Sequence, residues 1–537
     1  MPDFYHDKTR NLLIYRNTSQ FLTDQLRQAI PEAREINGSY LAVPRNLRNS
    51  QVLRHFNYPV APVIHDQNYD FPIEPGRTPL PHQKIYANFQ ILHPRCHNLG
   101  DPGTMKTLSS LWAADRLMQW HPKGKFRAII VAPLTILDTV WASAIFKNFL
   151  GRRSFEILHG TADKRSRLLA TKPDFAIINY DGIGIGTQTR KKFELGSLAN
   201  QIMEDEDIKL VIIDESRGYG DSTSLRSRIA RVVFKHHPYM WQLCGSPTPQ
   251  APTDCYGMAK LLNNAQGKSF RTFQMETMTK VSQFKWVPQR DGYKKAKELL
   301  TPAVRFGLDE IWQGPEQTIQ QREVELTDEQ KKLMASLKRD LQMAVKNGQL
   351  ITAAHEGAAR QKLLQISMGA VYDANHRAHL VDSAPRLHEL DQIVASTQRK
   401  VVVFVGLTSV VHLVYKHLSK HWRCGIINGE VSQKNRAEEI RLFASEPDYK
   451  AVIADPSVVS HGINEFVVAD TGIWYGPVDK VDDWIQGNKR IRRPGQQFPS
   501  TIFQIVSNKT EKAIFQRLET NTTLQGLMLD MVRKGEL

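Results

Sequence analysis

The chain has 537 residues, too many for one ordinary hydrophobic core, so about two to four domains are expected. With 41% hydrophobic and 23% charged residues, its composition is that of a soluble globular protein and not of a disordered one. Its longest apolar runs fall far short of the roughly 20 residues that a membrane-spanning helix needs. The N-terminal sequence MPDFYHDKTRN lacks the apolar core of a secretion signal. We therefore expect neither a membrane protein nor a secreted one.

The charge balance is strongly basic, with 71 Lys and Arg against 55 Asp and Glu, a formal net charge of +16. Such a field suits a polyanionic partner, because each neutralised phosphate releases condensed counterions. A basic protein without such a partner fits the charge alone equally well.

The four cysteines, Cys96, Cys244, Cys255 and Cys424, show no paired CxxC spacing. This scatter favours neither a zinc ribbon nor a disulfide scaffold, and it is typical of a reducing cytoplasm.

Short apolar runs separated by helix-compatible stretches predict parallel sheets with crossover helices. The first half contains four predicted strands: Ala128 to Ala132, Phe175 to Tyr180, Leu210 to Asp214 and Met240 to Gly245. The second half contains five: Val401 to Gly406, Cys424 to Asn428, Ala451 to Asp455, Thr471 to Gly476 and Thr501 to Val506. We expect an α/β protein with two lobes and a cleft between them.

Two further regions differ from these lobes. Thr327 to Lys346 has Gln330 three residues after Thr327, a capping-box arrangement at the start of a helix. With a second helical stretch at Ala358 to Ala370, it predicts a helical connector. Residues 1–77 lead into the turn-rich run DFPIEPGRTPLP (70–81), which is typical of a linker. The expected units are an N-terminal accessory domain with linker (1–77), lobe 1 (78–310), the connector (311–385) and lobe 2 (386–537).

A candidate phosphate loop is GDPGTMKT, Gly100 to Thr107. Small residues let backbone N–H groups approach phosphate oxygens, Lys106 supplies an ammonium, and Thr107 supplies a hydroxyl for Mg²⁺. Met105 stands where the common pattern has glycine, which tolerates close approach and positive φ as methionine does not. An imperfect match of this kind also arises by coincidence.

The run Leu210 to Ile213 is followed directly by DESR, Asp214 to Arg217. A buried strand ending in two carboxylates is where phosphate-loop ATPases hold Mg²⁺ and orient the attacking water. Asp214 is the candidate metal ligand and Glu215 the candidate base. The alternative is a helix N-terminus, where carboxylates are favoured in any protein.

A basic cluster, QGNKRIRRPGQ, spans Gln486 to Gln496. Arg490 and Arg493 are three residues apart, so on a helix they share a face. Guanidinium groups across a cleft can stabilise charge on a transferring phosphoryl group. A surface cluster that binds phosphates of any kind is the alternative interpretation.

Taken in order, these segments resemble the motifs of superfamily-two helicases, specifically the Swi/Snf-like branch of DNA translocases. The similarity covers residues 78–508 and includes PLPHQ (79–83), GDPGTMKT, VAPLTILDTVW (131–141), DESR, LCGSPTPQ (243–250), KVVVF (400–404), INGEVSQKNRAEEIRLF (427–443), SHGINEFVVADTGIWYGP (460–477) and QGNKRIRRPGQ. The chain departs from the family pattern at Met105, at Arg217 in place of the last His of DEAH, and at Arg492 in place of His.

The resemblance implies two RecA-like lobes and a set of site residues. Gln83 would contact adenine, and Asp214 and Glu215 would complete the Mg²⁺ and water site. Arg490 and Arg493 would act as arginine fingers. The implied ATP-binding residues are Gln83, Gly100, Gly103, Thr104, Lys106 and Thr107, and the implied Mg²⁺ ligands are Thr107 and Asp214. The implied DNA contacts are Pro133, Asn179, Tyr180, Ser460 and Asn464.

The function implied is an ATP-dependent, Mg²⁺-dependent translocase that moves on duplex, forked or branched DNA and remodels or anneals it. An RNA helicase and a nucleic-acid-binding scaffold with a decayed ATPase are the alternatives. We expect a cytoplasmic protein of a bacterium or a phage-infected cell, a monomer in its basal state. Short N-terminal modules also precede the motor in annealing helicases and phage-encoded relatives, so residues 1–77 are a candidate DNA sensor.

Overall fold

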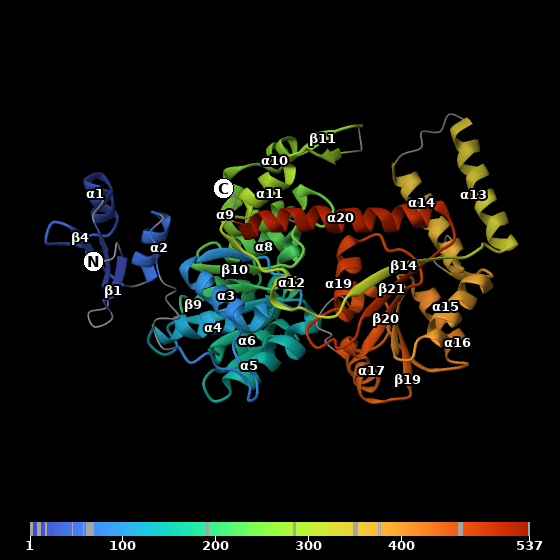
Figure 1. The fold of residues 1–537 in the computed structure, drawn as a ribbon, viewed down its shortest axis with the longest axis horizontal. Coiled ribbons are helices and arrows are strands. Elements are labelled where there is room, and N and C mark those ends of the chain that lie inside the picture. Colours follow the sequence, from blue (N-terminus) through green and yellow to red (C-terminus); the bar gives the residue numbers. More distant parts are fainter. Residues whose placement is uncertain are drawn as a thin grey trace.

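Three bodies lie in a row along the longest axis of the computed structural model: an N-terminal module, lobe 1 and lobe 2 (Figure 1). The structure describes residues 4–7, 12–16, 19–45, 47–56, 58, 60, 69–188, 193–282, 286–346, 353–373, 375, 377–459 and 465–534. Within this part of the chain, no helix is long and apolar enough to cross a membrane.

The N-terminal module is a four-stranded antiparallel sheet of order β1-β2-β4-β3 with two helices. Its elements are β1 (Phe4–Asp7), β2 (Leu12–Arg16), α1 (Gln20–Ala29), β3 (Arg34–Ile36), β4 (Tyr40–Pro44) and α2 (Leu47–His55). Alternate residues of β2 and β4, such as Leu13 and Val43, pack with Leu26 of α1 in a separate small core. The module therefore has a core of its own, as expected for an accessory domain.

Lobe 1 is built on a seven-stranded parallel sheet of order β13-β5-β10-β9-β6-β8-β7. The strands are β5 (Arg95–Asn98), β6 (Arg127–Ala132), β7 (Phe155–Ile157), β8 (Phe175–Asn179), β9 (Ile208–Ile213), β10 (Tyr239–Leu243) and β13 (Ala303–Val304). Their apolar residues are buried on both faces, which is the reason for the near-continuous apolar runs. The four strands predicted in this half are confirmed to within two residues.

Helices cover both faces of this sheet. One layer consists of α3 (Pro81–Leu92), α4 (Lys106–Gln119) and α5 (Ser143–Phe149), and the other of α6 (Ala162–Ala170), α7 (Ser197–Glu204) and α8 (Leu225–Val233). A third cluster packs α9 (Tyr256–Asn263), α10 (Phe270–Thr277) and α11 (Gly292–Leu299). The remaining elements are the hairpin β11 (Met278–Lys280) and β12 (Trp286–Pro288), and α12 (Leu308–Ile311).

Residues 69–74 do not behave as a free linker, because specific bonds fix them to lobe 1. The Trp112 indole donates to the Pro72 carbonyl at 2.7 Å, and the Glu74 amide donates to Asn148 at 2.9 Å. Beside them, the Tyr69 hydroxyl donates to the buried carboxylate of Asp115 at 2.8 Å.

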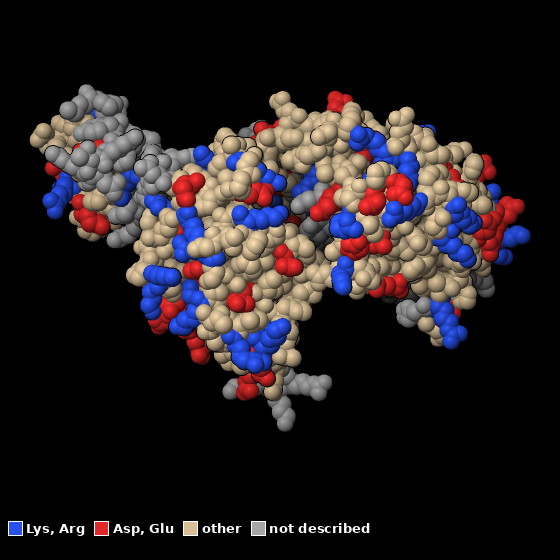
Figure 2. Space-filling model, turned by 90° about the horizontal axis from the view of Figure 1, so that it is seen from below, with Lys and Arg blue, Asp and Glu red and all other residues tan. Residues whose placement is uncertain are grey.

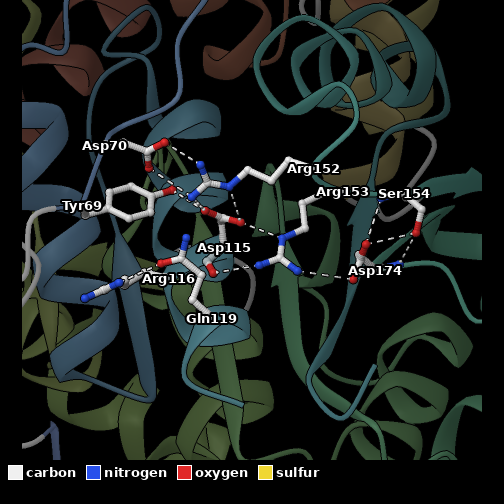
Figure 3. A network of polar contacts seen from close by, with 9 residues as sticks. All are labelled: Tyr69, Asp70, Asp115, Arg116, Gln119, Arg152, Arg153, Ser154 and Asp174. Carbon is white, nitrogen blue, oxygen red and sulfur yellow. Dashed lines mark hydrogen bonds and ion pairs between the residues drawn. The ribbon is translucent and has the colours of Figure 1, made fainter. Parts of the chain in front are cut away.

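Asp115 is the centre of the polar network in Figure 3, where Arg152 and Arg153 point toward it from the segment after α5. Arg152 donates to Asp115 at 2.5 and 3.2 Å and also binds both carboxylate oxygens of Asp70. Arg153 donates to Asp115 at 2.6 Å. The network thus joins the extended segment to α4 and to the start of β7.

Lobe 2 contains a six-stranded parallel sheet of order β14-β21-β20-β17-β19-β18. The strands are β14 (Gln317–Glu323), β17 (Lys400–Phe404), β18 (Arg423–Ile427), β19 (Tyr449–Ala454), β20 (Ala469–Trp474) and β21 (Ser500–Val506), and the helices are α15 (Ala384–Ser396), α16 (Thr408–Leu418), α17 (Gln433–Ser445), α18 (Pro456–Val459) and α19 (Val481–Ile491). All five predicted strands are present. Together the two parallel sheets, flanked by helices, confirm the predicted α/β class with two RecA-like lobes.

The two helical stretches predicted between the sheets are present as α13 (Asp328–Lys346) and α14 (Ala353–Met368), followed by the hairpin β15 (Ala370–Tyr372) and β16 (Ala378–Leu380). The capping box is also confirmed. The Thr327 amide donates to Gln330 Oε1 at 3.0 Å, and the Gln330 amide donates to the Thr327 hydroxyl at 3.3 Å.

The last helix, α20 (Lys509–Lys534), begins in lobe 2 after β21 and runs back to lobe 1, where it lies along α11 (Figure 1). Lobe 2 is therefore joined to lobe 1 both by the chain that leads into β14 and by α20.

Candidate active site between the two lobes

The phosphate-loop sequence follows β5 and leads into α4. Gly100 leaves no room for a side chain, because a Cβ there would lie 1.9 Å from the Tyr86 hydroxyl. Gly103 has a φ of +87°, a conformation that glycine adopts without strain. Gly100 is therefore required by its packing against Tyr86, and Gly103 by its backbone conformation.

Met105 adopts the left-handed conformation that the common glycine would adopt, with φ 59° and ψ 36°. Met105 is 39% exposed. The expectation that methionine would disturb the loop is thus resolved: the turn forms, and the residue bears the backbone strain.

Lys106 opens α4, and its ammonium lies within the loop. Its Nζ donates to the carbonyls of Gly100 at 2.6 Å and Asp101 at 3.0 Å. Burial lowers the pKa of Lys106, and Glu215 and Asp214 partly offset this effect. Thr104 is buried, while Thr107 is half-buried in the first turn of α4.

Asp214 and Glu215 follow the C-terminal end of β9, as predicted. Asp214 accepts from the Trp141 indole at 2.9 Å and from the Glu215 amide at 2.9 Å. Burial and the neighbouring Glu215 raise the pKa of Asp214 to about 6. Burial also raises the pKa of Glu215, against the opposing effects of Lys106 and Arg490.

Arg490 comes from lobe 2 and is buried near this carboxylate pair. Burial and the neighbouring Arg493 lower its pKa to about 9, while Glu215 opposes the shift. Burial likewise lowers the pKa of Arg493. The two arginines do not share a helix, since α19 ends at Ile491. Arg493 precedes Pro494, which disfavours helical backbone at that position.

Ion pairs connect the lobes around this centre. Lys489 contacts Asp101 of the phosphate loop at 3.2 Å, with Asp101 also 3.3 Å from Arg305. Against the effect of burial, Lys489 and Arg305 lower the pKa of Asp101.

Both arginines that depart from the family pattern also join the lobes. Arg217 lies 3.8 Å from Asp482 of α19 and donates to the Asp254 carbonyl at 2.9 Å. Arg492 pairs with Asp309 at 2.7 Å.

A cavity of about 480 Å³ lies beside the phosphate loop, with residues of α12, β14, α19 and α20 in its wall. Asp101 and Lys489 are among them. The surface in Figure 2 is also hollowed between the lobes, and basic and acidic side chains are interspersed on both sides.

Gln83 lies in the first turn of α3 and is buried. Its Oε1 accepts from the Leu80 amide at 3.0 Å, whereas its buried Nε2 has no partner among the described residues. The neighbouring His82 contacts the Thr104 carbonyl at 3.2 Å, which places the start of α3 against the phosphate loop.

Three of the five predicted DNA contacts lie at strand ends of lobe 1. Pro133 follows β6, and Asn179 ends β8 and accepts from Arg165 at 3.1 Å. The Tyr180 hydroxyl donates to the carbonyls of Asp214 at 2.5 Å and Glu215 at 3.0 Å. Ser460 and Asn464 lie outside the described residues.

Sequence reasoning missed Trp141, Asp101 and Lys489 as members of this centre. All three lie inside segments that were quoted as motifs, so their position was available. Their contacts could not be predicted from the sequence, because each bond joins segments that are far apart in the chain.

Comparison with known proteins gives the family. The model of the SNF2-related domain matches residues 96–378, more than half of the chain, and the model of the helicase conserved C-terminal domain matches residues 385–495. The chain therefore belongs to the SNF2-related family, the Swi/Snf-like branch of superfamily-two helicases, and carries its helicase-type ATPase core.

Two solved structures are similar to the chain. They are the Sulfolobus solfataricus SWI2/SNF2 ATPase core in complex with dsDNA (18% identity, TM-score 0.39, 86% of this chain and 95% of that chain) and the Sulfolobus solfataricus SWI2/SNF2 ATPase core domain (17%, 0.38, 85% and 92%). The search of curated protein sequences found no significant match.

Proposed function

We propose that the protein is a DNA-stimulated ATPase that couples ATP hydrolysis to movement on duplex or branched DNA, which it remodels or anneals. The convergence of Lys106, Asp214 and Glu215 from lobe 1 with Arg490 from lobe 2 carries this proposal, because these are the charges that phosphoryl transfer requires. Family membership and the net charge of +16 support nucleic acid as the partner.

Each residue has a proposed role that fits its surroundings. Lys106 exchanges its loop carbonyls for phosphate oxygens, and Glu215 orients and deprotonates the attacking water. Arg490 and Arg493 stabilise charge that develops on the transferred group. The unpartnered Nε2 of Gln83 is suited to an acceptor atom of adenine.

Thr107 and Asp214 would hold Mg²⁺, whose charge offsets that of the phosphates. The raised pKa of Asp214 fits this role, since a nearby cation would favour its ionised form. Gly100, Gly103 and Thr104 form the turn that brings backbone N–H groups to the phosphates.

The DNA path proposed here crosses Pro133, Asn179 and Tyr180 of lobe 1 and Ser460 and Asn464 of lobe 2. Tyr180 links this path to catalysis, because its hydroxyl holds the backbone carbonyls of both Asp214 and Glu215. A strand that shifts Tyr180 would therefore shift the carboxylates, which would account for the proposed stimulation by DNA.

The test is an ATPase assay of the wild type with single-stranded, duplex and forked DNA and with RNA side by side. We expect selective stimulation by DNA. Glu215→Gln should still bind ATP but hydrolyse it slowly, and Lys106→Ala should lose hydrolysis. Selective stimulation by RNA would favour an RNA helicase, and normal turnover in Lys106→Ala would refute the assigned loop.

A further inference from the structure

A second surface feature lies away from the interlobe cleft, on the outer helical layer of lobe 1. It is a groove of about 550 Å³ lined by Phe193, Met203, Arg228, Arg231, Val232, Lys235 and His236. These residues come from α7, from α8 and the turn after it, and from the segment that precedes α7. The proposed catalytic residues lie instead at the carboxyl ends of the strands and in the lobe contact.

The charge of the groove is of one sign. Among the described residues that line it, Arg228, Arg231, Lys235 and His236 are basic and none is acidic. Arg228 lies over the Phe193 ring at 5.1 Å, and Arg231 donates to the Ser222 carbonyl at 2.6 Å. In the part of the chain that the structure describes, no carboxylate pairs with Arg228, Arg231 or Lys235.

Several other surface arginines are paired with carboxylates. Arg226, on the same helix, binds both carboxylate oxygens of Asp181 at 2.8 and 2.7 Å. In lobe 2, Arg423 binds Asp448 and Arg441 binds Glu438, each at 2.8 Å. The groove is thus a local excess of positive charge, which favours an anionic partner.

The spacing of the basic side chains in the groove suits a polymer with regularly spaced negative charges. Arg228, Arg231 and Lys235 follow one another at intervals of three and four residues, so they lie along one side of α8 and its following turn, over about 10 Å. A phosphodiester backbone presents one negative charge per nucleotide, and several successive charges can be met at once.

The apolar residues of the groove indicate a second property of the partner. Phe193 and Met203 are half-buried, and Val232 is 41% exposed. Surfaces that combine a cationic edge with an aromatic side chain bind single strands, because unpaired bases can pack on the ring. A duplex keeps its bases stacked inside and cannot use these apolar residues.

We propose that the α7–α8 groove binds a single strand of nucleic acid, with phosphates on Arg228, Arg231 and Lys235 and bases on Phe193 and Met203. This goes beyond the proposed motor, because the groove would hold an unpaired arm of a branched substrate while the duplex arm lies across the lobes. An acidic peptide is the competing occupant.

The test compares Arg228→Glu/Lys235→Glu with the matched control Lys147→Glu/Lys420→Glu, which changes the charge equally at exposed lysines of α5 and lobe 2. Binding of labelled oligo-dT, blunt duplex and a fork is measured by anisotropy without ATP. We expect the groove variant to bind oligo-dT and the fork at least about tenfold more weakly, with the salt slope reduced by about 1.4 for two lost phosphate contacts. The control variant and duplex binding should not change.

A second variant separates charge from packing. Phe193→Ala should weaken oligo-dT binding by about fivefold to tenfold, from the loss of one stacked base, without a change in salt slope. Hydrolysis of ATP without nucleic acid should be normal in all four proteins, which shows that they are folded.

Three outcomes would overturn the groove proposal. They are wild-type affinity for oligo-dT in the groove variant, an equal loss in the control variant, and a groove variant that loses only binding to a labelled poly-Glu peptide. The proposed motor is judged separately. If DNA fails to stimulate hydrolysis while the groove variant loses oligo-dT, the motor proposal fails and the groove stands.

Discussion

Two groups of buried charges, one within lobe 1 and one between the two lobes, are organised in opposite ways. Around Asp115, Tyr69, Arg152 and Arg153 supply donors to both carboxylate oxygens. Although burial works against it, the hydrogen bonds to Asp70 and Asp115 raise the pKa of Arg152. The network neutralises itself within the protein (Figure 3).

In the cleft, burial shifts the pKa values of the charged groups away from their ionised forms. The pKa of Asp214 is raised to about 6, the pKa of Arg490 is lowered to about 9, and the pKa of Lys106 is also lowered. Each shift has burial as its first cause, so the ionised forms are held at a cost to stability. The difference supports the proposal that the cleft binds a charged ligand, whereas the network around Asp115 is structural.

The largest expected effect is on ATP turnover, and it tests the difference between the two groups of charges. Arg493→Ala should lower ATP turnover by about 10³-fold or more, because an arginine finger acts only in the transition state. The free energy of unfolding of Arg493→Ala should not fall, because the substitution removes a guanidinium group whose burial is unfavourable. The measurements are steady-state hydrolysis and urea unfolding. Arg153→Ala is the control, and we expect it to have lower stability and unchanged turnover. If Arg493→Ala loses only DNA affinity, Arg490 and Arg493 bind DNA phosphates and are not arginine fingers.

Next in size is an effect on stability. Asp115→Asn should lower the free energy of unfolding of lobe 1 by about 3–5 kcal/mol, because two guanidinium groups lose their buried partner. Asp214→Asn should not be destabilised, since it removes repulsion from Glu215. Urea unfolding of the two variants side by side checks the contrast. Equal losses in both would remove the distinction between the two groups.

The third effect is a pH dependence, measured on protein in EDTA without nucleotide. The pKa of Asp214 is raised from 3.8 to about 6, so its proton is bound more tightly in the native protein than in the unfolded chain. The stability from this proton is complete below pH 3.8 and is lost as the pH rises through about 6.

Between these pH values, wild type should lose stability relative to Asp214→Asn by at most about 1.4 kcal/mol per pH unit. Trp141→Phe removes a hydrogen bond that lowers the pKa of Asp214, so it should move this loss to higher pH. A difference between wild type and Asp214→Asn that is constant from pH 4 to pH 6 would contradict the assignment.

The smallest effect concerns the loop backbone. Met105→Gly should raise the free energy of unfolding by about 1 kcal/mol, since glycine adopts positive φ without the side-chain clash. Met105→Ala keeps the Cβ and should show no gain. Thermal unfolding of both variants provides the comparison, and an equal gain in the alanine variant would place the strain elsewhere.

The strands could be predicted where burial on both faces produces apolar runs, as in β6, β9 and β17. β14 could not, because QTIQQRE is a mostly exposed edge strand whose position is set by pairing with β21. β5 and β13 were missed because they are short, and RCHN of β5 contains mostly polar residues.

The candidate site shows the same division. Lys106, Asp214 and Glu215 could be chosen from local sequence, because each belongs to a strand-loop segment with a recognisable pattern. The partners Trp141 and Asp482 could not, since tertiary contacts place them. The roles of all the candidate site residues stay predictions, and Ser460 and Asn464 also lie outside the described residues.

The path of α20 bears on how the two lobes can move. Two lobes joined by a single segment could rotate freely about it. Helix α20, which lies along α11, is a second connection and restricts this rotation. If the lobes open and close as proposed, α20 would restrict that opening and keep the arginines of lobe 2 near the phosphate loop. In the proposed motor, α20 would therefore limit how far the two lobes separate.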